Sequence, residues 1–113
     1  MVIKSYSKIN FSLNINSKLK NGLHEIQSYY CLINLSDKIK ISKIKEKKDK
    51  IFFKGPFVKN IKKSNNSIIN TLNLLRKLKL ITSYYAVTII KNIPVFSGLG
   101  GGTSNAAFIL KFL

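Results

Sequence analysis

The first half of the chain alternates between apolar and polar residues, as strands do when one face is buried. From residue 8 to residue 16 the alternation is unbroken, with Lys, Asn or Ser at the even positions. A period of two over this length predicts a half-buried strand whose apolar side chains join the core. Those side chains are Ile9, Phe11, Leu13 and Ile15.

A turn and further strands follow before residue 56. Residues 17–22 are polar and end in Asn-Gly, which is a turn signal. Ile and Tyr then predict a long strand, and Ser36-Asp37 is expected to end it, so we interpret Asp37 as a turn residue without a chemical role. Gly55-Pro56 ends the last strand of this half. The predicted strands cover residues 24–35, 38–44 and 50–54, and together they predict an antiparallel meander with short connections.

The second half changes to a helical period. Residues 64–67 offer helix N-caps, with Asn66 favoured. Apolar residues at helical spacing from Ile68 to Leu78 predict an amphipathic helix. The remaining predicted elements are a strand over 86–92 with Val87 and Ile89 on one face, a loop over 94–102 and a helix over 103–113. The mixture predicts an α+β fold without internal repeats.

Composition limits the class of protein. The chain has 113 residues, 45% of them hydrophobic, which suits one small domain with a real core. It contains no apolar run of the roughly 18 residues that cross a bilayer and no signal-peptide pattern at its start. The single cysteine, Cys31, lies in an apolar run and is interpreted as a small core residue in a reducing compartment. We therefore expect a cytoplasmic protein that does not bind membranes.

The net charge of +16 raises the alternative of nucleic-acid binding. However, every basic residue except Arg76 is a lysine, and base and phosphate recognition favours arginine. The lysines are also spread along the chain, and the densest run, residues 43–50, suits a solvated hairpin end. We expect no nucleic-acid partner, but an attraction to small phosphate-bearing substrates.

The most informative segment is a glycine-rich loop between a predicted strand and a predicted helix. Residues 94–107 read Pro-Val-Phe-Ser-Gly-Leu-Gly-Gly-Gly-Thr-Ser-Asn-Ala-Ala. The glycines allow positive φ and close approach of a ligand, while Thr103 and Ser104 are expected to begin a helix whose free amides favour an anion. The loop has neither the Gly-Lys-Ser/Thr of a Walker loop nor the G-x-G-x-x-G spacing. It predicts a phosphate site built from backbone N–H groups.

This string resembles the second motif, the phosphate-binding loop, of the GHMP family of small-molecule kinases. The resemblance implies binding of ATP with Mg²⁺ and makes the Ser104 hydroxyl a candidate Mg²⁺ ligand. The residues that it assigns to ATP are Pro94, Val95, Phe96, Ser97, Gly98, Leu99, Gly100, Gly101, Gly102, Thr103 and Ser104.

A second motif opens the first strand. Taken alone, Lys8 and Asn10 are solvated residues on its polar face. The segment Ser7-Lys8-Ile9-Asn10 resembles the Pro/Ala-Lys-Ile/Leu-Asn segment of GHMP kinases that act on diphosphocytidyl methylerythritol. The resemblance implies that Lys8 assists the catalytic base and that Asn10 binds substrate. Ser7 departs mildly from the pattern.

The third motif contains the chain's only histidine. Residues 22–28 resemble the Gly-Tyr-His-x-Ile/Leu-x-Ser/Thr segment of the same kinases, which implies that His24 contributes to a cytosine pocket. Leu23 replaces the tyrosine of that pattern, so an apolar contact replaces ring stacking on this side of the base. Asn66 before Ser67-Ile68-Ile69 resembles the Asn-Leu-Ile helix start of the family.

Together these motifs imply a ribosomal-protein-S5-like N-terminal domain, with a largely antiparallel sheet and helices on one face. Residues 1–113 are expected to form an incomplete ATP-binding domain that lacks the C-terminal GHMP domain. The implied activity transfers the γ-phosphoryl of ATP to the 2-hydroxyl of 4-diphosphocytidyl-2-C-methyl-D-erythritol, a step of non-mevalonate isoprenoid synthesis. The family's catalytic Asp is expected beyond residue 113, so the fragment alone is expected to be inactive. The full-length protein is expected to be a monomer or a homodimer.

Three alternatives stay open at this stage. The first is a GHMP kinase for homoserine, galactose or mevalonate, against which His24 argues. The second is a basic S5-like module that binds RNA with steep salt dependence. The third is a remnant without catalytic activity that folds poorly alone.

Overall fold

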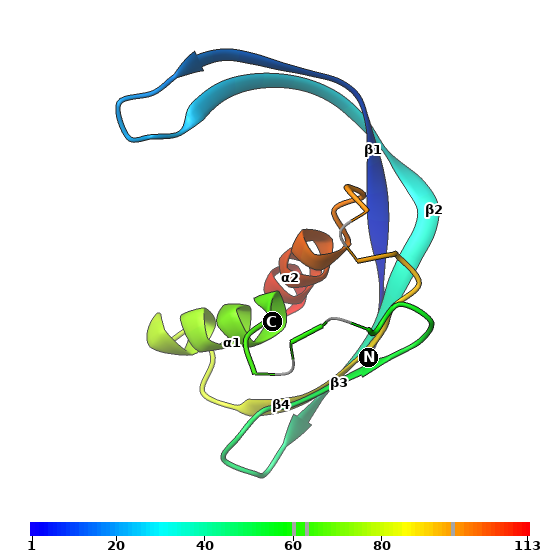
Figure 1. Cartoon of the computed structure of the whole chain (residues 1–113). Helices are drawn as coiled ribbons and strands as arrows, with labels where there is room; N and C mark the ends of the chain where they lie inside the picture. The colour runs from blue at the N-terminus through cyan, green and yellow to red at the C-terminus, as the bar shows by residue number, and fades with distance from the viewer. Residues whose placement is uncertain (60, 63, 96) are drawn as a thin grey trace.

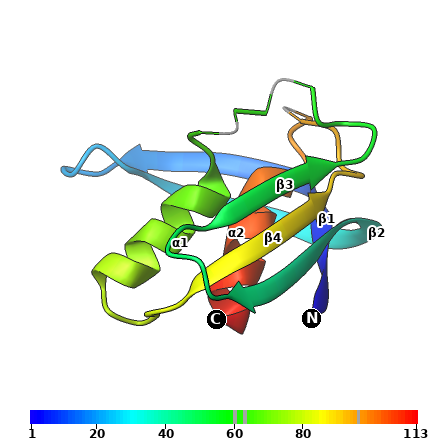
Figure 2. The same ribbon diagram turned by 90° about the horizontal axis from the view of Figure 1, so that it is seen from below.

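In the part of the chain that the structure describes, one sheet carries two helices on one of its faces (Figures 1 and 2). The computed structural model describes residues 1–113 except 60, 63 and 96. Its elements are β1 (Val2–Lys18), β2 (His24–Ile44), β3 (Lys50–Lys54), α1 (Ser67–Lys77), β4 (Tyr84–Ile90) and α2 (Gly101–Phe112). The expected α+β fold with a largely antiparallel sheet is confirmed.

The sheet has the strand order β1-β2-β4-β3. β1 pairs antiparallel with β2, β2 pairs antiparallel with β4, and β3 runs parallel to β4. A parallel pair needs a crossover, and α1 provides it between β3 and β4. The predicted meander is therefore correct for β1 and β2, but wrong for β3, because β4 lies between β2 and β3.

The core lies between the sheet and the two helices. The predicted face of β4 with Val87 and Ile89 is buried, and α1 places its apolar stripe on the sheet. The fully or almost fully buried apolar side chains include Ile3, Ile39, Ile41, Ile68, Leu72, Leu75, Val87, Ile89 and Ile109. No helix among the described residues has the length and apolar character needed to cross a membrane.

Residues 8–33, called the arm below, form a two-stranded ribbon that leaves the body of the protein (Figure 1). The prediction that Ile9, Phe11, Leu13 and Ile15 join the core is wrong, since all four are exposed, Phe11 to 72%. The reason is topological: β4 pairs with residues 38–44 of β2, so among the described residues no third strand flanks the arm. Cys31 is half-buried on the arm and is not a core residue.

The prediction that Ser36-Asp37 ends a strand is also wrong. β2 is continuous from His24 to Ile44, and Asp37 is fully buried within it. By contrast, the predicted N-cap of α1 is confirmed, since Asn66 Oδ1 accepts hydrogen bonds from the backbone N–H groups of Ile68 and Ile69, both at 3.1 Å.

Candidate nucleotide site

The glycine loop connects β4 to α2 and turns with two left-handed residues. Gly98 and Gly100 have φ values of 75° and 72°, as glycine allows without steric cost. Gly100 is the N-cap of α2, so the helix begins at Gly101 and not at Thr103 as predicted. The first amides of α2 have no partner within the helix, which suits an anion.

Gly101 is required for close packing and not for a positive φ. A Cβ at this position would lie 3.0 Å from Ile93 Cγ2 and 3.4 Å from Lys91 Nζ. At Gly102, in contrast, a Cβ would meet nothing within 4 Å. The two neighbouring glycines therefore face the body of the protein and open space, respectively.

A pocket of about 500 Å³ lies between the loop, the start of α1 and the segment before it. Its lining includes most of the residues predicted to bind ATP: Pro94, Val95, Ser97, Gly98, Gly100, Gly101, Gly102 and Thr103. Phe96 lies outside the described residues, and Leu99 and Ser104 are not part of the lining. The opposite wall, which the sequence did not predict, contains Phe53, Ile61, Lys62, Asn65, Ser67 and Ile68.

Ser104 faces β1. Its hydroxyl donates to the carbonyl oxygen of Tyr6 at 2.8 Å and accepts from the hydroxyl of Ser5 at 3.0 Å. These bonds attach the first turn of α2 to the edge strand of the sheet. The assignment of Ser104 to Mg²⁺ stays a prediction, and of the two hydroxyl residues that begin α2 after the glycines, Thr103 is the one that lines the pocket.

Lys8 lies against the loop. Its backbone N–H donates to the carbonyl oxygen of Leu99 at 3.0 Å, and its Cε lies 3.2 Å from the place of a Cβ on Gly100. The ammonium group of Lys8 is 5.5 Å from the centroid of the Tyr30 ring. The structure therefore brings together the first motif and the glycine loop, which are about ninety positions apart in the sequence.

The two predicted substrate residues lie farther out on the arm. Lys8 and Asn10 pair with Leu32 and Tyr30, so they share a face of the arm. His24 is exposed near the end of the arm, eight residues from Leu32, or about 26 Å along an extended strand. The turn of the arm lies apart from the glycine loop (Figure 1), so the structure does not bring His24 to that loop.

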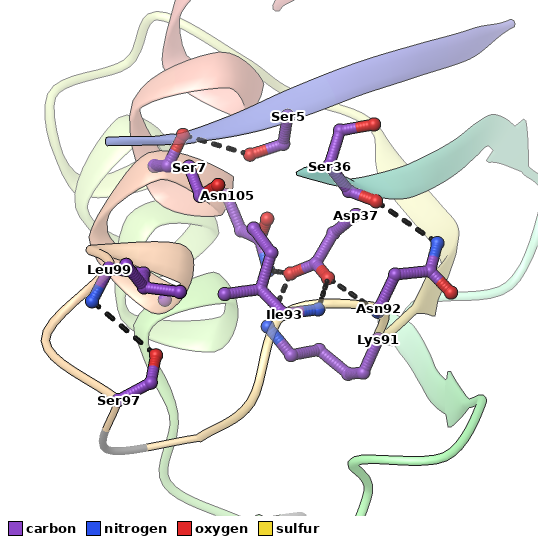
Figure 3. Close-up of polar contacts among 12 residues, drawn as sticks. Ser5, Ser7, Ser36, Asp37, Lys91, Asn92, Ile93, Ser97, Leu99 and Asn105 are labelled. Atoms are coloured by element: carbon purple, nitrogen blue, oxygen red, sulfur yellow. Dashed lines mark hydrogen bonds and ion pairs between the residues drawn. The ribbon is translucent and has the colours of Figure 1, made fainter. Parts of the chain in front are cut away.

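Asp37 connects β2 to both ends of the glycine loop (Figure 3). Its carboxylate accepts from the backbone N–H groups of Asn92 at 2.7 Å and Ile93 at 2.9 Å, before the loop. After the loop, Asn105 Nδ2 donates to the same carboxylate at 3.0 Å. Lys91, which directly follows β4 and precedes the loop, forms an ion pair with it through Nζ. We call Asp37, Lys91 and Asn105 the loop clamp.

Sequence reasoning missed the loop clamp, although a signal was present. Asp37 has the same parity as the buried Ile39 and Ile41, and Lys91 has the same parity as Val87 and Ile89. Alternation thus placed a carboxylate and an ammonium group on the core side of the sheet, where charged groups need partners.

Other charged groups do not add a metal centre among the residues that the structure describes. No group of three or more His, Cys, Asp and Glu residues could hold a metal ion there. The pKa of Glu46 is lowered from its ordinary value, mainly because Lys50 donates a hydrogen bond to its carboxylate in the turn between β2 and β3.

The second half of the chain matches a known protein family. Residues 66–113, which include α1, β4, the glycine loop and α2, match the family model described as GHMP kinases N terminal domain. The resemblance drawn from the motifs is confirmed: the chain is similar to the N-terminal part of a GHMP kinase.

Three curated relatives are named as 4-diphosphocytidyl-2-C-methyl-D-erythritol kinases. The protein of that name from Pelagibacter ubique is 44% identical over 111 residues, covering 97% of this chain and 39% of its own length. The chloroplastic one from Mentha piperita is 38% identical, covering 97% of this chain and 27% of its own length. The one from Ureaplasma parvum is 34% identical, covering 100% of this chain and 43% of its own length.

A solved structure supports the fold. The crystal structure of 4-(cytidine 5'-diphospho)-2C-methyl-D-erythritol kinase matches with a TM-score of 0.70 at 23% identity, over 98% of this chain and 38% of that chain. The chain therefore spans less than half the length of these relatives.

Proposed function

We propose that the chain is the nucleotide-binding part of a kinase that transfers the γ-phosphoryl of ATP to the 2-hydroxyl of 4-diphosphocytidyl-2-C-methyl-D-erythritol. The observation that carries this proposal is the position of Lys8 against the glycine loop, where its backbone N–H donates to Leu99 at 3.0 Å beside Gly100 of the pocket lining. The names of the relatives support the substrate. Residues 1–113 would then be part of the N-terminal domain, and the protein would act in the cytoplasm.

The pocket has the parts that a nucleotide needs. The free amides at the start of α2 can bind a phosphate group, and the helix dipole favours its charge. The apolar side chains of Phe53, Ile61 and Ile68 on the far wall can contact a base. Lys62 on the same wall adds a cation near the anionic ligand.

The residues present fit Mg²⁺ held mainly by the nucleotide. Mg²⁺ usually keeps several waters and binds substrate phosphates with one or two protein ligands. Thr103 would provide a hydroxyl oxygen in the pocket, while the Ser104 hydroxyl already bonds to β1. When bound, Mg²⁺ would neutralise charge on the transferred phosphoryl group.

In this proposal Lys8 supplies a positive charge at the reacting centre. An ammonium group there lowers the energy of the developing negative charge and keeps a nearby carboxylate ionised. That carboxylate, the base for the substrate hydroxyl, would come from a part of the protein outside residues 1–113. Asn10 and His24 would bind the substrate from the arm, with Leu23 in apolar contact with its base.

Binding measurements on the 113-residue chain test the proposal. We expect ATP with Mg²⁺ to bind in calorimetry and to raise the melting midpoint, because a ligand of the native state stabilises it by mass action. A single-stranded RNA should bind only weakly, with an affinity that falls steeply as salt increases. Tight RNA binding without any ATP binding would instead support the nucleic-acid alternative.

The substrate is tested separately in a full-length form of the protein. We expect phosphorylation of 4-diphosphocytidyl-2-C-methyl-D-erythritol and none of homoserine, galactose or mevalonate. Turnover of one of those three compounds, and not of the cytidine compound, would assign the protein to another GHMP activity.

A further inference from the structure

Lys91 is a buried cation beside the candidate phosphate site. It follows β4 directly, only 4% of its surface is exposed, and its ammonium group pairs with Asp37. Its backbone N–H donates to the carbonyl oxygen of Lys54 at 2.7 Å, which fixes the position of the residue. A buried charge lowers the stability of a protein unless it is paired and hydrogen-bonded. The ammonium group of Lys91 can therefore stay buried here only because Asp37 pairs with it.

The ammonium group lies under the first residue of α2. Lys91 Nζ is 3.4 Å from the place where a Cβ on Gly101 would be, and Lys91 lines the nucleotide pocket. A lysine ammonium group has three N–H donors, and the ion pair with Asp37 uses one of them. An anion bound at the start of α2 would therefore lie within reach of a second, fixed donor.

Asn105 provides an independent sign of a ligand. It is only 2% exposed, lies four residues after Gly101 on the same face of α2, and also lines the pocket. Its Nδ2 donates to Asp37, but its Oδ1 has no hydrogen-bond partner among the described residues. A buried oxygen without a hydrogen-bond partner destabilises the protein. A hydrogen-bond donor that enters the pocket with a ligand would remove this destabilisation.

Asp37 holds the arrangement together. It accepts hydrogen bonds from two backbone amides before the loop and from Asn105 after it, while it fixes Lys91 (Figure 3). A purely structural ion pair of this kind can often be replaced by neutral groups of similar volume without loss of stability. If the ion pair is only structural, its neutral replacement should keep both stability and ligand affinity. If Lys91 binds a ligand, the same replacement should keep stability and lower the affinity.

We propose that Lys91, positioned by Asp37, donates a hydrogen bond to a phosphate group of the nucleotide bound at the start of α2. Asn105 Oδ1 accepts a hydrogen bond from water that hydrates this phosphate. The inference rests on the proposed function, because it assumes that the pocket binds a nucleotide. It assigns a phosphate role to a residue outside the glycine loop.

The test compares Lys91→Met with the double variant Asp37→Asn/Lys91→Met in the 113-residue chain. The single variant should melt at a lower temperature, because it leaves a buried carboxylate without its cation. The double variant should recover most of the melting midpoint, since the pair is replaced by neutral side chains. Its affinity for ATP should nevertheless fall about 10- to 100-fold, as expected for the loss of a hydrogen bond to a charged group.

The phosphate series identifies the group that Lys91 contacts. Affinities for ATP, ADP, AMP and adenosine are measured by calorimetry for the parent chain and the double variant. The loss should be large for the phosphorylated ligands and absent for adenosine. Equal losses for adenosine and ATP, or no loss at all, would overturn the inference, because the loop clamp would then be only structural. A parent chain that binds no ATP would instead refute the proposed function itself.

A measurement without mutation covers the case in which the double variant does not fold. In the parent chain, the assigned NMR signal of the Lys91 Cε–Hε group should shift on addition of ATP and stay in place with adenosine. The corresponding signals of Lys43 serve as the control, because Lys43 is exposed near the C-terminal end of β2 and does not line the pocket. A Lys91 signal that does not respond to ATP, while ATP binds, contradicts a phosphate contact.

Discussion

Individual side chains decide the chemistry that this pocket can carry out. Lys8 is an exposed strand residue, and nothing in its own burial distinguishes it from the other lysines. Its position against Gly100 distinguishes it, because the long pairing of β1 with β2 and the bond to Leu99 bring it to the loop. Position also distinguishes the glycines of the loop. A Cβ on Gly101 would meet Ile93, whereas a Cβ on Gly102 would meet no protein atom within 4 Å.

In a full-length form, Lys8→Ala should lower kcat by about 10²-fold or more and change the KM values much less. Under the proposed function the charge acts when negative charge develops at the reacting centre, and positioned groups of this kind contribute about 10²-fold or more. Steady-state kinetics with both substrates measures the effect. Lys4→Ala is the matched control, because Lys4 is exposed on the same strand. A kcat within twofold of the parent would reduce Lys8 to a surface lysine.

Gly102→Val should remove ATP binding and leave the ligand-free protein folded. A side chain at Gly102 meets no protein atom, but it extends into the space beside the free amides where a phosphate would bind. We expect an unchanged melting midpoint without ATP and no rise on adding ATP.

Gly101→Val is the comparison for this variant. Its Cβ would lie 3.0 Å from Ile93, so it should lower the melting midpoint even without ligand. A full ATP-dependent rise in Gly102→Val would show that the glycine loop is not the phosphate site.

At the scale of elements, the local sequence predicts most helices and strands. The Asn cap and the apolar stripe predicted α1, and the parity of Val87 and Ile89 predicted the buried face of β4. Two features depend on partners that are distant in the sequence. The insertion of β4 between β2 and β3 is set by the crossover through α1, and the burial of Asp37 depends on donors more than fifty residues away. A short stretch of sequence around β2 contains neither β4 nor the donors to Asp37, so it cannot predict these two features.

Asn66→Ala should destabilise the protein by about 1 kcal/mol, the usual effect of losing an N-cap. The side chain accepts hydrogen bonds from two backbone N–H groups of the first turn of α1, where the helix itself offers no carbonyl partner. Urea unfolding followed by circular dichroism measures the change. Asn65→Ala is the control, since its Oδ1 accepts only a 3.4 Å bond from Asn70. Equal effects of the two substitutions would show that capping does not determine the stability of α1.

At the scale of the molecule, the same residue pattern has two different environments. The alternation of residues 8–16 is more regular than that of residues 38–44, yet only the second segment reaches the core, with β4 along its whole length and β1 beside residues 38–40. Alternation reports that a strand has one apolar face, but it does not report whether another element of the same chain covers that face. The burial of the arm was therefore predicted wrongly from an accurate pattern, while the roles of Lys8, Asn10 and His24 on it stay predictions.

This division of the molecule predicts two levels of stability. Isolated two-stranded ribbons are only marginally stable in water, so amide hydrogens of the arm should exchange much faster than those of Ile39, Ile41, Val87 and Ile89.

Phe11→Ser should change the free energy of unfolding by no more than about 0.5 kcal/mol, as for other exposed positions. Leu72→Ala, in the core between α1 and the sheet, should cost about 2–5 kcal/mol. Hydrogen exchange and urea unfolding of the 113-residue chain measure both quantities. If Phe11→Ser were as destabilising as Leu72→Ala, the apolar residues of the arm would be buried in solution, and the arm would have to pack against a second copy of the chain.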